Sequence, residues 1–251
     1  MKLAAQSSGI PEIFYSVQGE GRRMGMPSVF VRFSHCNLHC IWCDTDYTWN
    51  WIGTPFAHKR DGTPGYAKYK KDEQIVELDI DKVVHVVQGF PARNLVVTGG
   101  EPLLHDTDIV QLVRSLQGTI GTYHVEIETN GTLKPSEALA GCVNQFNVSP
   151  KLSNSGMSAK IRIRPNALEF FAKTPGAVFK FVVDDEKDIV EILDLVTAYS
   201  IDQERIWLMP QGTTPAELSR KGPWLVELCK TYRMNYSDRL HIRIFGERRG
   251  V

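Results

Sequence analysis

Three cysteines stand close together near the start of the chain. Cys36, Cys40 and Cys43 form a C-x3-C-x2-C pattern directly after the apolar run Val29 to Phe33. Thiolate sulfur is the usual ligand of iron–sulfur clusters, and three ligands on a four-iron cubane leave one iron with an open coordination position. The spacing therefore predicts a cluster to which a small molecule can bind.

Zinc is the alternative occupant of such a loop. Structural zinc sites usually have four ligands and no second C-x2-C pair follows, although His35 or His39 could supply a fourth. The remaining cysteines, Cys142 and Cys229, stand apart and fit small buried side chains. Because three of five cysteines fall within eight residues, metal ligation in a reducing compartment is a better interpretation than a disulfide framework.

A second motif is Gly99-Gly100-Glu101-Pro102, in which residues without Cβ let backbone groups approach the polar end of a ligand. It belongs to a set of polar loops that each follow an apolar run: Ser34 to Thr45, Gly99 to Leu103, Thr129 to Thr132, Ser149 to Lys151 and Pro210 to Thr214. In parallel sheets the ligand site lies where strands end and loops begin. We therefore expect these loops to line one mouth.

Short β-branched runs alternate with amphipathic stretches, which is typical of parallel strands covered by helices. The expected strands are Ser28 to Phe33, Asn94 to Thr98, Tyr123 to Glu128, Gln145 to Val148, Ala177 to Val183 and Arg205 to Met209. The expected helices are Gln74 to Val87, Thr107 to Leu116, Asp188 to Tyr199 and Pro215 to Tyr232. About six strands are too few for a closed barrel of eight, so the prediction is an α/β fold with a partial, open (β/α) barrel.

Composition narrows the class of protein. A chain of 251 residues, 42% hydrophobic and 23% charged, fits one domain over residues 1–251. Asn50 to Asp72 lacks periodicity, so we expect an exposed insertion or lid there. With 29 basic and 29 acidic residues there is no global field to attract nucleic acid or a membrane surface. No signal peptide or bilayer-spanning run is found, so a cytoplasmic location is expected.

The two motifs in this arrangement resemble the radical S-adenosylmethionine (SAM) superfamily. Further stretches narrow the resemblance: Glu12-Ile-Phe-Tyr-Ser-Val-Gln-Gly-Glu-Gly21, Pro27-Ser-Val-Phe-Val-Arg32, Trp42-Cys-Asp-Thr45, Val97-Thr-Gly-Gly-Glu-Pro102 and Ser149-Pro-Lys151. Together these stretches resemble the 7-carboxy-7-deazaguanine synthase family of the queuosine pathway. The resemblance runs through most of the chain.

The resemblance implies a radical SAM core and a lyase reaction in which 6-carboxy-5,6,7,8-tetrahydropterin becomes 7-carboxy-7-deazaguanine with loss of ammonia. The implied cofactors are a [4Fe-4S] cluster, SAM and Mg²⁺. In the superfamily the open iron binds the amino and carboxylate groups of SAM, and an electron from the cluster yields a 5′-deoxyadenosyl radical. That radical would abstract hydrogen from C6 of the pterin, and SAM is re-formed at the end of the cycle.

The resemblance also implies roles at individual positions, and assigns no catalytic side chain because the radical arises on SAM. For substrate binding it implies Val17, Gln18, Gly19, Glu20, Arg32 and Thr98. The guanidinium fork of Arg32 would pair with the pterin carboxylate. For SAM it implies Trp42, Cys43, Asp44, Gly100, Ser149, Pro150, Lys151, Met209 and Gln211; for metals it implies Cys36, Cys40 and Cys43 on the cluster and Thr45 on Mg²⁺.

Three features depart from the family pattern. His35 stands where a small residue, usually glycine, precedes the first cysteine. The stretch from Asn50 to Asp72 has no clear counterpart. Family members often end near a Gln-x-His-Lys-like string with a terminal carboxylate close to the substrate, whereas here Leu240-His241-Ile242-Arg243 continues to Val251, which could be a simple tail.

Two other functions remain open at this point. An activase that abstracts hydrogen from a glycine of a partner protein uses the same cysteine pattern, but Gln18-Gly19-Glu20 and Arg32 favour a small carboxylated substrate. A non-catalytic electron-transfer or sensing protein would need neither the glycine-rich turn nor Thr45. The family resemblance further implies a homodimer and an external reductant such as flavodoxin or ferredoxin.

Overall fold

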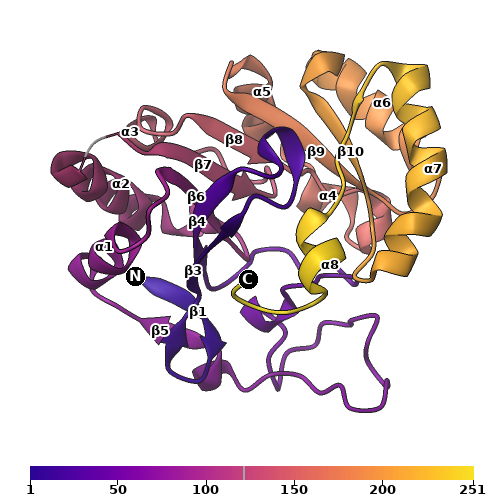
Figure 1. The fold of residues 1–251 in the computed structure, drawn as a ribbon. Coiled ribbons are helices and arrows are strands. Elements are labelled where there is room, and N and C mark those ends of the chain that lie inside the picture. Colours follow the sequence, from indigo (N-terminus) through magenta and orange to yellow (C-terminus); the bar gives the residue numbers. More distant parts are fainter. Residues whose placement is uncertain (121) are drawn as a thin grey trace.

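The computed structural model describes residues 1–120 and 122–251, which form one sheet with helices around it (Figure 1). The strand order is β11-β10-β9-β8-β7-β6-β4-β1-β2, with β3 paired to β4 and β5 paired to β1. The strands are β1 (Lys2–Ser7), β2 (Ile10–Pro11), β3 (Ile13–Val17), β4 (Pro27–Phe33), β5 (Ile75–Glu77), β6 (Asn94–Gly99), β7 (His124–Thr129), β8 (Gln145–Val148), β9 (Ala177–Val183), β10 (Ile206–Pro210) and β11 (Asn235–Tyr236).

The six strands expected from the sequence are β4 and β6 to β10, and they pair in parallel in that order. The two-residue strand β11 adds a further parallel partner to β10. In the described part of the chain the two ends of the sheet do not pair, so the barrel stays open. The prediction of a partial, open (β/α) barrel is confirmed.

The N-terminal part of the sheet was not predicted. Strands β1 and β3 run antiparallel to β4, and β5 pairs antiparallel with β1, where Leu3 lies opposite Val76. The expected helix Gln74 to Val87 is therefore wrong in its first part: Ile75–Glu77 is a strand, and the helix begins at Ile80. Pairing with a strand more than 70 residues away overrides the local pattern here.

Helices cover the outer side of the parallel strands, as Figure 1 shows for α1, α2, α6 and α7. The α-helices are α1 (Ile80–Gln88), α2 (Asp106–Ile120), α3 (Glu137–Ala140), α4 (Ala159–Arg162), α5 (Pro165–Lys173), α6 (Asp188–Tyr199), α7 (Pro215–Tyr232) and α8 (Leu240–Phe245). Short 3₁₀ turns are η1 (Gly21–Arg23), η2 (Asp46–Thr48), η3 (Lys71–Glu73), η4 (Pro102–His105), η5 (Ser153–Ser155) and η6 (Gln203–Arg205). Helices α6 and α7 have the predicted bounds, and α7 begins with a capping box between Thr214 and Glu217. None of the helices in the described residues is long and apolar enough to cross a membrane.

The two faces of the parallel strands differ in chemistry. Residues such as Leu95, Val97, Val125 and Ile127 point to the helices and belong to the main hydrophobic core. The alternate positions face the interior of the barrel, because side chains switch face at each residue of a strand. These interior positions carry buried polar groups, namely Ser28, Asn94, Glu126, Asn147 and Lys180. The interior is thus built to hold polar ligands.

Candidate active site

The loop that follows β4 carries the three cysteines and is fixed at several points. The backbone N–H of Cys43 donates to the carbonyl of Cys40 at 3.1 Å, and that of Ile41 donates to Ser155 at 3.0 Å. Cys36, Cys40 and Cys43 all face one cavity of about 280 Å³. The loop therefore presents three thiols to a single cavity.

The protein surroundings disfavour the thiolate form of all three cysteines. Burial raises the pKa of Cys36 and of Cys40, and it raises the pKa of Cys43 to about 12. All three are free of disulfides. No three His, Cys, Asp or Glu side chains within residues 1–120 and 122–251 are grouped to hold one metal ion. A donor set of three thiols around one cavity, with Cys40 buried and Cys36 and Cys43 partly buried, fits an iron–sulfur cluster, which binds them as thiolates.

The glycine-rich motif packs directly against the cysteine loop. A Cβ at Gly99 would meet the backbone of Phe33, and a Cβ at Gly100 would meet the carbonyl of His35 and the side chain of Cys36. The N–H of Glu101 donates to the His35 carbonyl at 2.8 Å. The two glycines thus let the end of β6 approach the backbone of the cluster loop, a contact that the motif alone did not predict.

Glu101 joins the loops at the carboxyl ends of the strands. Its buried carboxylate accepts hydrogen bonds from Leu103 N at 3.0 Å, Thr129 Oγ1 at 2.9 Å and Asn130 N at 2.7 Å. Burial raises the pKa of Glu101 to about 6, although these three donors act in the opposite direction. Glu101 is thereby placed to fix the loops after β6 and β7 relative to each other.

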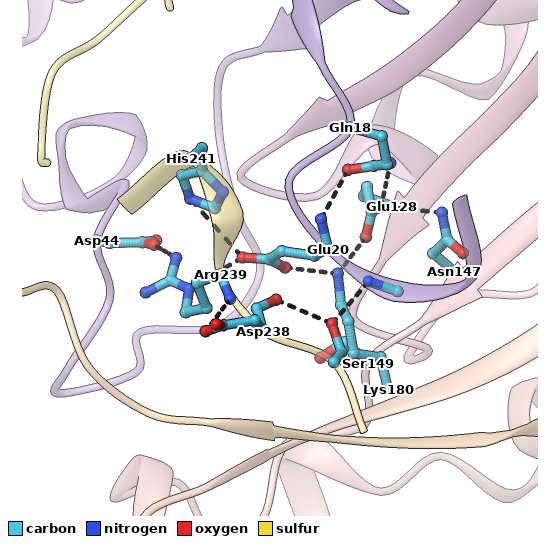
Figure 2. A network of polar contacts seen from close by, with 12 residues as sticks. Gln18, Glu20, Asp44, Glu128, Asn147, Ser149, Lys180, Asp238, Arg239 and His241 are labelled. Carbon is cyan, nitrogen blue, oxygen red and sulfur yellow. Dashed lines mark hydrogen bonds and ion pairs between the residues drawn. The ribbon is translucent and has the colours of Figure 1, made fainter. Parts of the chain in front are cut away.

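The loop after β3 brings Glu20 into the centre of a buried polar network (Figure 2). Lys180 donates to Glu20 Oε2 at 2.6 Å, and Arg239 donates through Nε to Oε1 at 2.9 Å. Burial by itself would raise the pKa of Glu20, but these two cations and His241 hold it well below its ordinary value. Glu20 therefore stays a carboxylate, able to accept hydrogen bonds from a ligand.

Glu128, at the end of β7, shares Lys180 with Glu20. Its Oε2 accepts from Lys180 at 2.8 Å, and its Oε1 accepts from Asn147 at 2.9 Å and from Gln18 at 3.2 Å. Burial, together with the nearby charge of Glu20, raises the pKa of Glu128 in spite of Lys180. Two carboxylates with pKa values shifted in opposite directions thus face one cavity.

His241, on α8, explains why position 19 is glycine. A Cβ at Gly19 would overlap the imidazole ring of His241, so the ring lies directly on the backbone of the Gln18-Gly19-Glu20 loop. Leu240 N donates to the Gly19 carbonyl at 2.8 Å, which ties α8 to the same loop. Burial lowers the pKa of His241 to about 4, so the ring is neutral at pH 7. The C-terminal helix is therefore part of the cavity wall.

Arg32 and Thr98 lie at matched positions on the neighbouring strands β4 and β6, and both line the cavity. Arg32 donates through Nε to Glu12 Oε1 at 2.9 Å. Burial opposes its charge, but Glu12 outweighs burial and raises the pKa of Arg32. Arg32 is thus a fully charged guanidinium with its terminal nitrogens still available.

The residues expected to bind SAM lie along the same cavity. Asp44 pairs with Arg239, whose positive charge lowers the pKa of Asp44 although burial acts to raise it. Lys151 donates to Ser149 Oγ at 2.8 Å, and Gln211 is held by Lys221, which donates to its Oε1 at 3.1 Å. Each of these pairs fixes a polar side chain in the wall of the cavity.

The cavity brings together every residue that the sequence suggested for the site except Pro150. The lining members are Val17, Gln18, Gly19, Glu20, Arg32, Cys36, Cys40, Trp42, Cys43, Asp44, Thr45, Thr98, Gly100, Ser149, Lys151, Met209 and Gln211. Sequence reasoning missed Glu12, Tyr47, Lys180 and Arg239, which line it too. Lys180 had a detectable signal, since it is the single charge in the fully buried strand β9.

Comparison with known proteins agrees with this geometry. The family model described as "Radical SAM superfamily" matches residues 30–174. The 7-carboxy-7-deazaguanine synthase of Pyrobaculum aerophilum is 34% identical over 240 residues, covering 95% of this chain and 95% of that protein. The enzyme of the same name from Halobacterium salinarum is 35% identical over 260 residues, covering 95% and 90%. The chain belongs to the 7-carboxy-7-deazaguanine synthase family.

A solved relative supports the fold of this radical SAM synthase. The crystal structure of QueE from Escherichia coli matches with a TM-score of 0.65 and 27% identity, and the match covers 94% of each chain. The radical SAM superfamily uses a [4Fe-4S] cluster and SAM, and the three cavity-facing thiols of this family member fit the cluster. Cys36, Cys40 and Cys43 are the residues that would hold it.

Proposed function

We propose that this enzyme converts 6-carboxy-5,6,7,8-tetrahydropterin into 7-carboxy-7-deazaguanine with loss of ammonia, in 7-deazapurine and queuosine biosynthesis. The observation that carries the proposal is one cavity that joins three thiols, a charged arginine and an ionised glutamate. The thiols suit a cluster, the arginine suits a carboxylate, and the glutamate suits the N–H groups of a pterin.

Different side chains bind the two ends of the substrate. Arg32 binds the carboxylate, because its terminal nitrogens form a fork that matches the two oxygens. Glu20, kept ionised by Lys180 and Arg239, accepts hydrogen bonds from the ring and amino N–H groups at the other end. Val17, Gln18, Gly19 and Thr98 complete the substrate contacts. Substrate bound in this way is fixed in orientation before any reaction begins.

The bound cluster and SAM supply the radical that starts the rearrangement. The proposed SAM contacts are Trp42, Cys43, Asp44, Gly100, Ser149, Lys151, Met209 and Gln211, all of which line the cavity, whereas Pro150 of the same loop does not. Apolar walls exclude water from the reacting centre, since Phe14, Phe30 and Leu38 also line the cavity. Thr45 is the residue that would offer a hydroxyl to Mg²⁺, an ion that commonly keeps several waters and binds substrate oxygens.

The remaining assignments are part of the same proposal. The chain acts as one domain and as a homodimer in the cytoplasm, where thiols stay reduced. A small one-electron carrier, flavodoxin or ferredoxin, reduces the cluster. Light scattering in solution tests the dimer, and reduction kinetics with each carrier test the donor.

Anaerobic turnover is the decisive test. The reconstituted enzyme is given reductant, Mg²⁺, SAM and the carboxylated tetrahydropterin, and mass spectrometry is used to look for 7-carboxy-7-deazaguanine. If SAM is cleaved while the pterin is unchanged, the substrate assignment is wrong and a protein substrate becomes the better candidate. Cys40→Ser is expected to lose cluster iron, whereas the matched control Cys142→Ser, on a cysteine outside the cavity, is expected to keep it.

A further inference from the structure

One edge of the Arg32 guanidinium is occupied before any substrate arrives. Its Nε donates to Glu12 Oε1 at 2.9 Å, and the other oxygen of Glu12 accepts a hydrogen bond from the Tyr47 hydroxyl at 2.7 Å. Glu12 is 1% exposed and Tyr47 is 3% exposed, so water cannot replace either partner. Both oxygens of Glu12 are therefore engaged in holding Arg32 in one orientation.

This arrangement decides which part of Arg32 faces the ligand. With Nε bound to Glu12, the two terminal nitrogens are the donors that remain for a carboxylate. A guanidinium is planar and rigid, so holding one edge aims the other. The pairing with Glu12 also has an electrostatic cost. The negative charge of Glu12 offsets the positive charge of Arg32 and so weakens the attraction of Arg32 for the carboxylate of a ligand.

The C-terminal tail brings another arginine to the same place. Arg249 lines the cavity, and its guanidinium carbon lies 3.5 Å from the centroid of the Tyr47 ring and 5.3 Å from that of Tyr69. Its Nη1 donates to Gln74 Oε1 at 2.9 Å. A guanidinium over an aromatic face is an attractive contact, so Arg249 fixes the ring whose hydroxyl holds Glu12.

The position of the tail is also defined by its neighbours. A Cβ at Gly250 would overlap the side chain of Gln6, which shows that the tail lies closely on β1. Residues Gly246 to Val251 all line the cavity. In Figure 1 the chain runs from α8 across the mouth of the barrel to the C-terminus near the N-terminal strands. The tail is thus a wall of the cavity, seated by contacts on β1 and beside β5.

We propose that Glu12, Tyr47 and Arg249 are positioning residues that aim Arg32 at the carboxylate of the substrate, with Arg249 acting through the Tyr47 ring. The inference rests on the proposed function and extends it, since it assigns selection of a carboxylated pterin to four residues and includes the C-terminal tail. The sequence assigned no role to any of the three positioning residues, although Glu12 begins one of the family-like stretches. The tail of this chain is therefore a determinant of specificity.

The test compares two ligands that do not react. The cluster-loaded enzyme with SAM and Mg²⁺, but without reductant, is titrated with 6-carboxypterin and with pterin that lacks the carboxylate, and binding is followed by pterin fluorescence. The preference of the wild-type enzyme for 6-carboxypterin is expected to fall about tenfold in Tyr47→Phe and in Arg249→Met. Affinity for the unsubstituted pterin is expected to stay within about twofold.

Two further variants separate positioning from general damage. Arg249→Lys keeps the cation over the ring and is expected to restore most of the preference. Arg93→Met removes an equivalent arginine–tyrosine contact, at 5.3 Å from the Tyr123 ring and outside the cavity, and is expected to leave both affinities unchanged. Glu12→Gln is also expected to lower the preference for 6-carboxypterin. If that variant does not fold, Tyr47→Phe tests the same contact.

A double-mutant cycle with Arg32→Met gives the sharpest readout. If Tyr47 and Arg249 act through Arg32, their substitution changes nothing further once Arg32 is gone. The inference is overturned if the variants keep the full carboxylate preference, if they lose both ligands equally, or if their effects add to that of Arg32→Met. A wild-type enzyme with no preference for 6-carboxypterin overturns the proposed function, and this inference with it.

Discussion

Lys180 and Glu20 form a buried ion pair, with Nζ of the lysine 2.6 Å from Oε2 of the glutamate. The lysine side chain is only 5% exposed and also contacts Glu128 at 2.8 Å. These two carboxylates outweigh the effect of burial and raise the pKa of Lys180, so it stays charged. One cation in an otherwise apolar strand, together with Arg239, therefore keeps the proposed pterin-binding carboxylate ionised.

Replacing Lys180 with methionine is expected to damage both stability and binding. Glu20 and Glu128 would be left buried with one fewer cation, which costs about 3 to 5 kcal/mol of unfolding free energy. One of them would take up a proton, so pterin affinity should fall by about tenfold or more. Urea denaturation and pterin titration measure the two effects. Lys180→Arg keeps the charge and should be milder; unchanged affinity in Lys180→Met would contradict the role given to this lysine.

The pH dependence of stability should carry a contribution from His241. Burial lowers its pKa from 6.5 to about 4, so the unfolded chain binds a proton in this window that the folded protein does not. Stability therefore falls as pH drops from 6.5 toward 4, by at most about 1.4 kcal/mol per pH unit and by less for a side chain that is 30% exposed. Glu20, whose pKa is lowered, acts in the same direction at lower pH.

His241→Gln is expected to flatten this slope. The comparison is urea denaturation of wild type and variant at pH 7 and pH 5, at equal cluster content. His85→Gln, on the exposed side of α1, is the matched control and should keep the wild-type slope. Equal losses of stability in wild type and His241→Gln would show that the ring does not titrate as inferred.

Much of this site could be predicted because strand ends define it. The run of β-branched residues from Ala177 to Val183 predicted the bounds of β9 correctly. Because neighbouring strands are parallel, the loops that follow them then lie at one end of the barrel. Pro150 was carried over with its loop, but only its neighbours Ser149 and Lys151 line the cavity. Arg239 had no local signal, since its role depends on α8 folding back across the barrel. Contacts between distant segments, such as Arg249 on Tyr47, cannot be found from local spacing.

His35 stands where the family pattern usually has glycine, and its backbone lies in the left-handed region that favours glycine. Its φ is 71°, a region that costs a residue with a Cβ roughly 1 to 2 kcal/mol. His35→Gly should therefore be more stable than His35→Ala by about 1 kcal/mol. The same pair of substitutions at His85 in helix α1 should give the reverse order. Thermal unfolding of the four variants measures both differences, and the same order at both positions would argue against strain at His35.

The segment from 50 to 72 packs on the outside of the cysteine loop, and none of its residues lines the cavity. His58 Nε2 lies 2.9 Å from the Cys43 carbonyl, and Phe56 stacks on His39 with ring centroids 3.4 Å apart. Buried Asp46 anchors the segment by accepting hydrogen bonds from Arg60 at 2.6 Å and Tyr66 at 2.5 Å.

Asp46→Asn should loosen that cover. A neutral amide forms no ion pair with the Arg60 guanidinium, and only one of its two polar atoms accepts hydrogen bonds. Proteolysis within the segment should become faster, and a chelator should remove iron from the cluster sooner than in the wild type. Asp72→Asn, an exposed substitution at η3, is the matched control and should change neither rate. If proteolysis accelerates while iron loss does not, the segment is anchored by Asp46 but does not protect the cluster, and its cover over the cysteine loop has another purpose.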